Sequence, residues 1–270
     1  MDSRQWDWIV PKGLWEIARP LLPMPRIRPQ GGGITGIADE AVFATIVYVL
    51  VSGCAWQALP PCFGASKSTV YRRFVIWSRA GVGAAAPGVS WAGWPPRICW
   101  MYRAWCSIRR MYVPKRGEYT GPSPVDRGKS GSKLHILPDA AGLPLVVELS
   151  AANTPDGHRL KPMVTRLQLS HEPVRGEYRK PGKLHADKAY DHPELQRRLG
   201  SKRIEVRIAR EVKSSTRLGR HRWVIERTIA WLFGYRRLSP RYERHPDAYL
   251  AFLTLAAVVT CYKRYLKLTI

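Results

Sequence analysis

The chain has 270 residues, of which 45% are hydrophobic, enough for a buried core in one large domain or one medium and one small domain. Its 44 lysines and arginines against 20 acids give a net charge of +24, which predicts a polyanionic partner, with nucleic acid ahead of an anionic membrane surface. The longest apolar run, Leu250 to Cys261, is too short to cross a bilayer, so we expect a buried C-terminal helix and no membrane partner.

The amino terminus argues against a secreted protein, and the cysteines argue against a protein held together by zinc or disulfides. Residues 1–8 contain acids and no uninterrupted apolar stretch, so we expect no secretory signal and a cytoplasmic protein. The five cysteines form no CxxC pair and have no histidine partner at metal-ligand spacing. This pattern favours buried thiols over a zinc site or a disulfide framework.

Residues 1–81 are predicted to form a helical unit. The stretch 6–22 carries an amphipathic pattern, and the proline- and glycine-rich stretch 20–33 is typical of a loop. Apolar residues at three-to-four spacing then predict a helix from Asp39 to Gly53.

Another helix is predicted to begin at Ser66 or Ser68. It would carry Lys67, Arg72 and Arg73 on one side and apolar residues on the other. A helix, a turn and a basic helix together predict a helix-turn-helix that binds DNA through these three cations. Two ordinary packed helices with a solvated basic face are the simpler alternative.

Residues 82–114 lack both helical and strand periodicity. They contain four tryptophans and scattered arginines. We therefore predict an irregular segment here.

From Gly131 onward the pattern predicts an α/β succession. Alternating residues in 132–137 and 145–149, joined by a turn that includes Asp139, indicate a hairpin. The elements expected after it are a helix over 157–169, a strand over 183–187, a helix through Leu199, a strand over 203–208 and an amphipathic helix over 218–233.

Two acids of this region are candidates for chemistry. Asp187 follows a short strand, where a carboxylate can point into a crevice, and its neighbours His185 and Lys188 suit a cation site beside a polyanion. An acid in this position is more often simply a helix N-cap. Arg222 and Glu226 are four residues apart and share a helix face, which a surface ion pair would also explain.

Four segments carry a specific combination of motifs. They are GSKLH at 131–135, AANT at 151–154, HADKAYD at 185–191 and GRHRWVIER at 219–227. This combination resembles the insertion-sequence-five family of bacterial DDE transposases. Similar stretches at 53–60 and 69–74 extend the resemblance over nearly the whole chain.

The resemblance implies an α/β fold with an RNase H-like mixed sheet and flanking helices, preceded by a small all-α helix-turn-helix-like domain. It implies DNA-binding residues 1–81, an irregular segment 82–114 and a catalytic domain 115–270. Members of the family cut and join the ends of their element with three carboxylates and two divalent ions, Mg²⁺ or Mn²⁺. The partner would be double-stranded DNA at the bacterial nucleoid, bound by a homo-oligomer.

By the same resemblance, Asp187 and Glu226 are the second and the last catalytic, metal-binding acids. Arg222 could hold a phosphate. The DNA contacts implied or predicted are Lys67, Arg72, Arg73, Lys188 and Arg222. Gly219 and Phe233 depart from the family, which has Tyr and Lys there, so the contacts of that Tyr and Lys are not expected in this chain.

The first acid of the family is absent. It should lie near Ser107, Ile108 and Arg109, where the chain has no Asp or Glu. Codons for this stretch can be chosen so that another reading frame encodes an Asp at the junction of Ser107 and Ile108. We therefore hypothesise that roughly residues 83–114 are translated out of frame. True divergence, with Asp126 or another acid as substitute, is the alternative.

The function predicted is an insertion-sequence transposase that binds terminal inverted repeats and performs metal-dependent strand cleavage and transfer. Because the first catalytic acid is missing, an inactive transposase is one alternative for this chain. The alternative is a non-catalytic DNA-binding protein derived from a decayed transposase, because a basic surface does not depend on a metal site. A nuclease acting on RNA is disfavoured, since no aromatic RNA-recognition motif is present.

Overall fold

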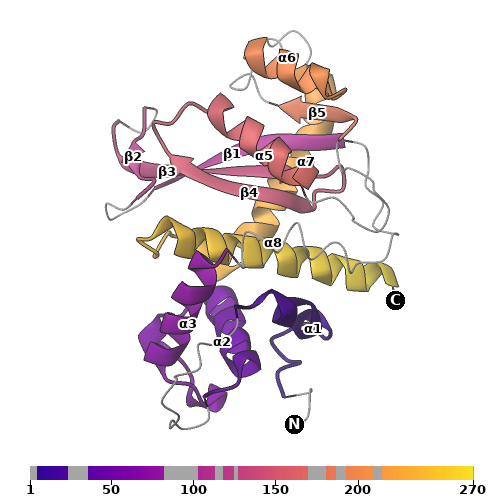
Figure 1. Cartoon of the computed structure of the whole chain (residues 1–270). Coiled ribbons are helices and arrows are strands. Elements are labelled where there is room, and N and C mark those ends of the chain that lie inside the picture. Colours follow the sequence, from indigo (N-terminus) through magenta and orange to yellow (C-terminus); the bar gives the residue numbers. More distant parts are fainter. Residues whose placement is uncertain are drawn as a thin grey trace.

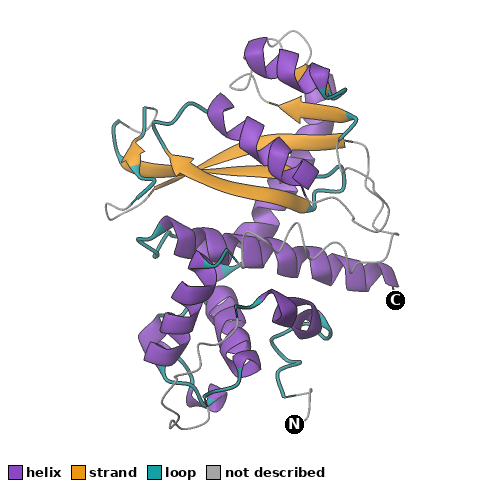
Figure 2. Ribbon diagram, viewed as in Figure 1, coloured by secondary structure: helices purple, strands orange, loops and turns teal. Residues whose placement is uncertain are grey.

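The computed structural model has three layers, with a long C-terminal helix between a sheet and a group of N-terminal helices (Figures 1 and 2). This helix, α8 (Pro246–Thr269), contacts α2 (Asp39–Ser52), α3 (Lys67–Arg79) and strand β4 (Pro144–Ala151). The structure describes residues 5–23, 36–81, 103–112, 118–124, 127–169, 181–186, 193–208 and 215–269. It describes only the backbone of residues 103–112, 168–169, 208, 215–222 and 268–269.

The amphipathic stretch 6–22 is helical only in its second half. Helix α1 spans Leu14–Ala18 and continues as a 3₁₀ turn, Arg19–Leu21. Pro11 has no amide hydrogen, and Gly13 has a φ of 84°, in the left-handed region. A helix therefore cannot run through this point, and the residues before it form turns.

Helix α2 begins and ends close to the predicted residues, and α3 begins at Lys67, between the two predicted starts. Gly53 ends α2 with a φ of 71°, and a Cβ at this glycine would lie 2.7 Å from the Cβ of Arg236. The glycine thus allows both the turn and the close approach of the segment before α8. Ser66 precedes α3, and its hydroxyl accepts a hydrogen bond from the Thr69 amide at 3.2 Å, which caps the helix.

The strands form one mixed sheet, in which β4, β3, β1, β5 and β6 follow in that order. The bounds are Arg103–Tyr112 for β1, Gly121–Pro122 for β2, Ser130–Pro138 for β3, Lys183–Ala186 for β5 and Glu205–Ile208 for β6. Strand β3 is antiparallel to both β1 and β4, whereas β5 and β6 continue parallel to β1. The predicted hairpin of β3 and β4 is confirmed, and so is the mixed α/β architecture.

Strand β1 lies inside the sheet and corrects one prediction. The stretch 82–114 was predicted to be irregular, which is wrong for the 10 residues of β1. This strand pairs with β3 on one edge and with β5 on the other. Residues 107–112 pair with β3 and residues 103–106 with β5, and these backbone hydrogen bonds do not require an alternating side-chain pattern. Residues 82–102 and 113–117 lie outside the described residues, and the domain boundaries stay a prediction.

Four helices accompany the sheet. They are α5 (Gly157–Leu169), α6 (Pro193–Ser201), α7 (Ser215–Phe233) and α8. Helix α5 packs on β4 and α6 on β6, while α7 contacts both β1 and α8. The apolar run expected to be a buried C-terminal helix lies within α8, where most of its side chains are buried. Within the described ranges, no helix has the length and apolar character needed to cross a membrane.

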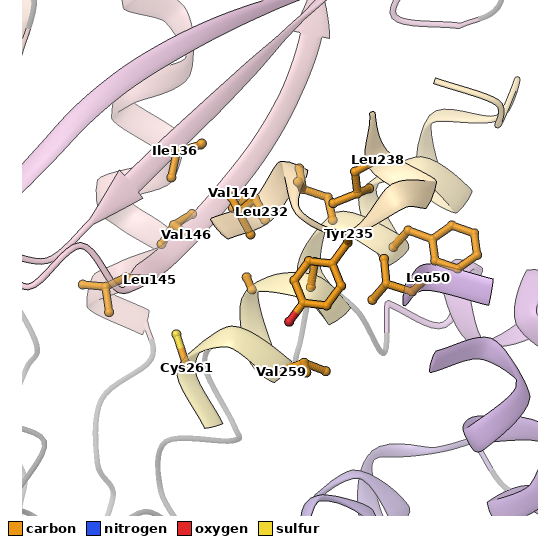
Figure 3. Packing of buried hydrophobic residues seen from close by; sticks show 14 of the residues in the cluster. Leu50, Ile136, Leu145, Val146, Val147, Leu232, Tyr235, Leu238, Val259 and Cys261 are labelled. Atoms are coloured by element: carbon orange, nitrogen blue, oxygen red, sulfur yellow. The ribbon is translucent and has the colours of Figure 1, made fainter. Parts of the chain in front are cut away.

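One hydrophobic core connects the sheet with the N-terminal helices. Figure 3 shows Leu50 of α2, Val146 of β4 and two residues of the α7–α8 connection, Tyr235 and Leu238, in the same cluster. All four side chains are at most 9% exposed. The connection between α7 and α8 is therefore the place where the two parts of the molecule share buried surface.

Candidate active site and nucleic-acid surface

Glu226 lies on α7, with its side chain exposed to solvent. The next two residues fix the helix on the turn between β3 and β4. The Arg227 Nη2 donates a hydrogen bond to the carbonyl of Ala141 at 2.5 Å, and the buried Thr228 hydroxyl donates to the carbonyl of Gly142 at 2.6 Å. These bonds set the rotation of α7 about its axis. They therefore also set the direction in which Glu226 leaves the helix.

Strand β1 is the common neighbour of the elements that carry the two candidate acids. Helix α7 contacts β1, and β1 pairs in parallel with β5 so that Cys106 lies opposite Ala186. Asp187 directly follows Ala186 in the sequence and lies outside the described residues, as does Lys188. Arg222 is described for its backbone alone, one helical turn before Glu226.

The residues that are described do not complete a metal site. Strand β1 reads RAWCSIRRMY and contains no acid. Ser107 follows Cys106 on β1, as Asp187 follows Ala186 after β5. In the described part of the chain, no three His, Cys, Asp or Glu residues are grouped so that they could hold a metal ion. Asp126, the possible substitute, lies outside the described residues.

Two other titratable groups of the sheet are buried and structural. Asp139, the predicted turn residue, accepts a hydrogen bond from the Leu143 amide at 2.8 Å, and burial raises its pKa from 3.8 to about 6. His135 on β3 has its pKa lowered from 6.5 to about 4 by burial, and its Nε2 lies 2.8 Å from the Ser150 hydroxyl. Each is at most 2% exposed. Neither side chain can reach a DNA substrate.

Helix α3 exposes only two of its three predicted DNA contacts. Lys67 and Arg72 are exposed, whereas Arg73 is partly buried. The Arg73 Nη1 donates to the Asp39 carboxylate and, at 2.8 Å, to the Ile37 carbonyl. Successive residues of a helix point about 100° apart, so one arginine faces solvent while the next faces the start of α2. Arg73 thus joins two helices and is not free for DNA in this conformation.

Sequence analysis missed two buried arginines before α8. The Arg237 guanidinium donates to the Glu243 carboxylate at 2.5 Å and to the carbonyl of Cys54 at 2.9 Å. Arg241 donates to the Ser132 hydroxyl at 2.6 Å. In a chain with 44 basic residues, composition and spacing do not distinguish a buried arginine from a surface one. The hydrogen bonds to Cys54 and Ser132 join segments that are distant in the sequence, so only the structure shows them.

Comparisons with known proteins match most of the chain in two parts. Residues 10–86 match the family described as "Putative transposase of IS4/5 family", and residues 110–261 match the family described as "Transposase DDE domain". The two matches leave residues 87–109 uncovered.

Two relatives come from an insertion element of Burkholderia cepacia. "Putative transposase for insertion sequence element IS402" is 40% identical over 159 residues, which are 57% of this chain and 72% of the relative. "Insertion element IS402 uncharacterized 16.2 kDa protein" is 34% identical over 76 residues, 27% of this chain and 52% of the relative. A solved structure, "Mos1 transposase paired-end complex with left transposon end", aligns over 90% of this chain and 81% of its own, at 11% identity and a TM-score of 0.28.

An RNase H-like sheet with helices before it, matched by a DDE domain over more than half of the chain, defines a DDE transposase. Such a domain implies a dependence on divalent metal ions. The particular family is fixed by the amino-terminal match and the relative that is 40% identical. The chain belongs to the IS4/5 family of insertion-sequence transposases.

Proposed function

We propose that this transposase binds the terminal inverted repeats of its element through α2 and α3, with Asp187 and Glu226 as two of its catalytic carboxylates. One observation supports this pair of acids. Strand β1 adjoins both β5, which ends one residue before Asp187, and α7, which carries Glu226. Acids on two elements that adjoin one strand can approach a common point beside it.

The chemistry explains why these residue types suit the reaction. Carboxylate oxygens are the ligands that Mg²⁺ and Mn²⁺ prefer, and such ions activate a nucleophile and stabilise a leaving oxygen when they are bound. We propose Mg²⁺ or Mn²⁺ as the metal, and Lys67, Arg72, Lys188 and Arg222 as contacts to DNA phosphates. The protein would act on double-stranded DNA at the bacterial nucleoid, assembled there as a homo-oligomer.

This copy lacks the acid that β1 should supply. The uncovered interval 87–109 falls inside the stretch 83–114 that we propose is translated out of frame. The alternate frame would encode an Asp at the junction of Ser107 and Ile108. The register of β1 supports position 107 for the missing acid. Cys106 pairs with Ala186, and Ser107 and Asp187 are the residues that follow this pair. We infer that the protein binds DNA as it stands and cleaves it poorly.

A gain-of-function variant tests this proposal. Ser107→Asp adds a carboxylate on β1 beside β5, the strand that ends one residue before Asp187, so we expect Mn²⁺-dependent nicking of element-end DNA that the unmodified chain performs poorly. Ile108→Asp is the matched control, because successive residues of a strand point to opposite faces of the sheet. Nicking is measured on labelled duplexes carrying the inverted repeat, and affinity for the same duplexes is measured by fluorescence anisotropy.

Three results would decide the question. Nicking by Ser107→Asp alone, abolished by adding Asp187→Asn or Glu226→Gln, would support the assignment of all three positions. Efficient nicking by the unmodified chain would refute the claim that it lacks a catalytic acid. Nicking by both Ser107→Asp and Ile108→Asp would refute the assignment of the first catalytic acid to position 107. The nucleotide sequence across residues 83–114 tests the frame independently, since an alternate frame without an Asp codon there rules it out.

A second function is favoured by the acid-free strand β1. A decayed transposase that no longer cuts DNA can still bind it, because binding rests on a basic surface. Salt-sensitive binding to element ends, with no metal-dependent cleavage even in Ser107→Asp, would favour this non-catalytic DNA-binding protein.

A further inference from the structure

Helices α1, α2, α3 and α8 enclose a cavity of about 70 Å³. Figure 1 shows that the N-terminal helices lie on one side of α8 and the sheet on the other. None of the residues that we assign to catalysis or to DNA contact lines the cavity. Since roughly 10–15 Å³ already holds one water molecule, the cavity has room for part of a larger molecule.

The way in which α1 is anchored explains the empty space. Before the helix begins, the Lys12 carbonyl accepts a hydrogen bond from the Tyr262 hydroxyl of α8 at 2.6 Å. Within the helix, the ring centroid of Trp15 lies 5.6 Å from that of Phe43 on α2. The helix has five residues and passes into a 3₁₀ turn that contains Pro20. It is thus held on two neighbours but is too short to fill the space between them.

Two alanines keep the space open. Ala18 of α1 and Ala251 of α8 line the cavity, and a longer side chain at either position would take up part of it. Both alanines are half-buried, as are Ile17 and Leu255 of the lining. The cavity therefore reaches the surface between α1 and α8, where a molecule can enter from solvent.

The lining offers apolar contact to a ligand. Every lining residue except Ser78 has an aliphatic or aromatic side chain. The Ser78 hydroxyl donates a hydrogen bond to the carbonyl of Phe74, one turn earlier in α3, at 2.7 Å. Among the described residues, no charged side chain lines the cavity. A charged group inside it would lose its hydration without gaining a partner, so the occupant must be apolar.

Size and opening narrow the apolar ligand to a chain. A cavity of about 150 Å³ encloses one benzene ring, so a space of about 70 Å³ suits a narrow alkyl chain better than a ring. Because the cavity opens to solvent, the polar end of such a molecule can stay in water. We propose that this cavity binds the alkyl chain of a small uncharged amphiphile between α1, α3 and α8. Since only the folded chain has this site, the ligand stabilises the fold, and its binding does not depend on the proposed catalytic acids.

A series of 1-alkanols tests the site. Binding of 1-butanol, 1-hexanol and 1-octanol to the full chain is measured by isothermal titration calorimetry. Each buried methylene contributes a factor of about four in affinity, so 1-hexanol should bind about fifteenfold more tightly than 1-butanol. The further gain for 1-octanol should be smaller, because the cavity is then full. 3,3-Dimethyl-1-butanol has as many carbons as 1-hexanol but a wider end, and it should bind roughly tenfold more weakly than 1-hexanol.

Filling the cavity locates the bound chain. Ala251→Leu and Ala18→Leu each add three carbons to the lining, and each should weaken 1-octanol binding by roughly tenfold or more. Ala58→Leu is the matched control, because Ala58 is exposed and does not line the cavity. It should leave the affinity for 1-octanol unchanged.

Three results would overturn the site. Equal 1-octanol affinity in the filled and control variants would mean that the alkanol binds elsewhere. A flat dependence on chain length in the unmodified chain would exclude burial of the alkyl chain, whether or not the filled variants fold. No measurable binding of 1-octanol at its solubility limit would exclude an alkyl-chain site altogether.

Discussion

Two buried residues of the sheet, Asp139 and His135, should oppose each other in the pH dependence of stability. Burial raises the pKa of Asp139 from 3.8 to about 6, so the folded chain holds a proton that the unfolded chain has lost, and stability falls as the pH rises through this interval. Burial lowers the pKa of His135 from 6.5 to about 4, so stability rises with pH over nearly the same interval. Together they should almost cancel.

Single substitutions would reveal each effect. Asp139→Asn keeps an acceptor for the Leu143 amide and removes the ionisation, so relative to the unmodified chain it should gain on the order of 3 kcal/mol between pH 4 and pH 7. His135→Gln should lose stability over the same interval, by a similar amount. Urea unfolding at both pH values measures the two differences. Equal slopes in both variants would contradict the assignment of opposite shifts.

Two adjacent arginines of helix α3, Arg72 and Arg73, should have different roles in DNA binding and in stability. Arg72 is exposed beside Tyr71, which is 39% exposed, and Ile76, which is 50% exposed, so these three residues form an open face. Arg73 is bound to Asp39. Arg72→Ala should therefore weaken binding to element-end DNA by about tenfold and reduce the salt slope by about one. Anisotropy titrations at several salt concentrations measure both quantities.

Arg73→Ala is the comparison within the same helix. It should leave DNA affinity within about twofold and lower the free energy of unfolding by roughly 1 kcal/mol, because the ion pair is partly exposed. The assignment fails if Arg73→Ala reduces DNA affinity as much as Arg72→Ala in a fully folded protein. In that case Arg73 must leave Asp39 when DNA binds.

The elements that sequence predicts well are those whose pattern is local. Helix α5 has the bounds expected from its apolar spacing, and the β3–β4 hairpin follows from alternation around the Asp139 turn. Helix α1 is shorter than the pattern because Gly13 and Pro11 break it. Strand β1 could not be predicted, since distant strands hold it from both edges. The pairing of Arg73 with Asp39 likewise depends on a contact between distant residues that no local pattern predicts.

On the scale of the whole molecule, the N-terminal helices and the sheet should unfold together. The hydrophobic cluster is continuous from α2 to β4, and Arg237 of the α7–α8 connection adds a hydrogen bond to the N-terminal part. Arg237 in this connection binds both Glu243 and the carbonyl of Cys54 at the end of α2, and its side chain is only 6% exposed. A transposase with this link holds its N-terminal helices against its sheet through buried contacts. Thermal unfolding followed by circular dichroism and by tryptophan fluorescence should give one coincident transition.

Removing the arginine tests whether this link couples the two parts. Arg237→Ala leaves the Glu243 carboxylate buried without its cation, so it should cost about 3–5 kcal/mol and separate the two unfolding signals. Adding Glu243→Gln should recover part of the loss, because the uncompensated charge is gone. Lys183→Ala breaks an ion pair between side chains that are 38% and 46% exposed, and should change neither the midpoint nor the coincidence of the signals. Coincident transitions with an unchanged midpoint in Arg237→Ala would mean that apolar packing alone couples the two parts.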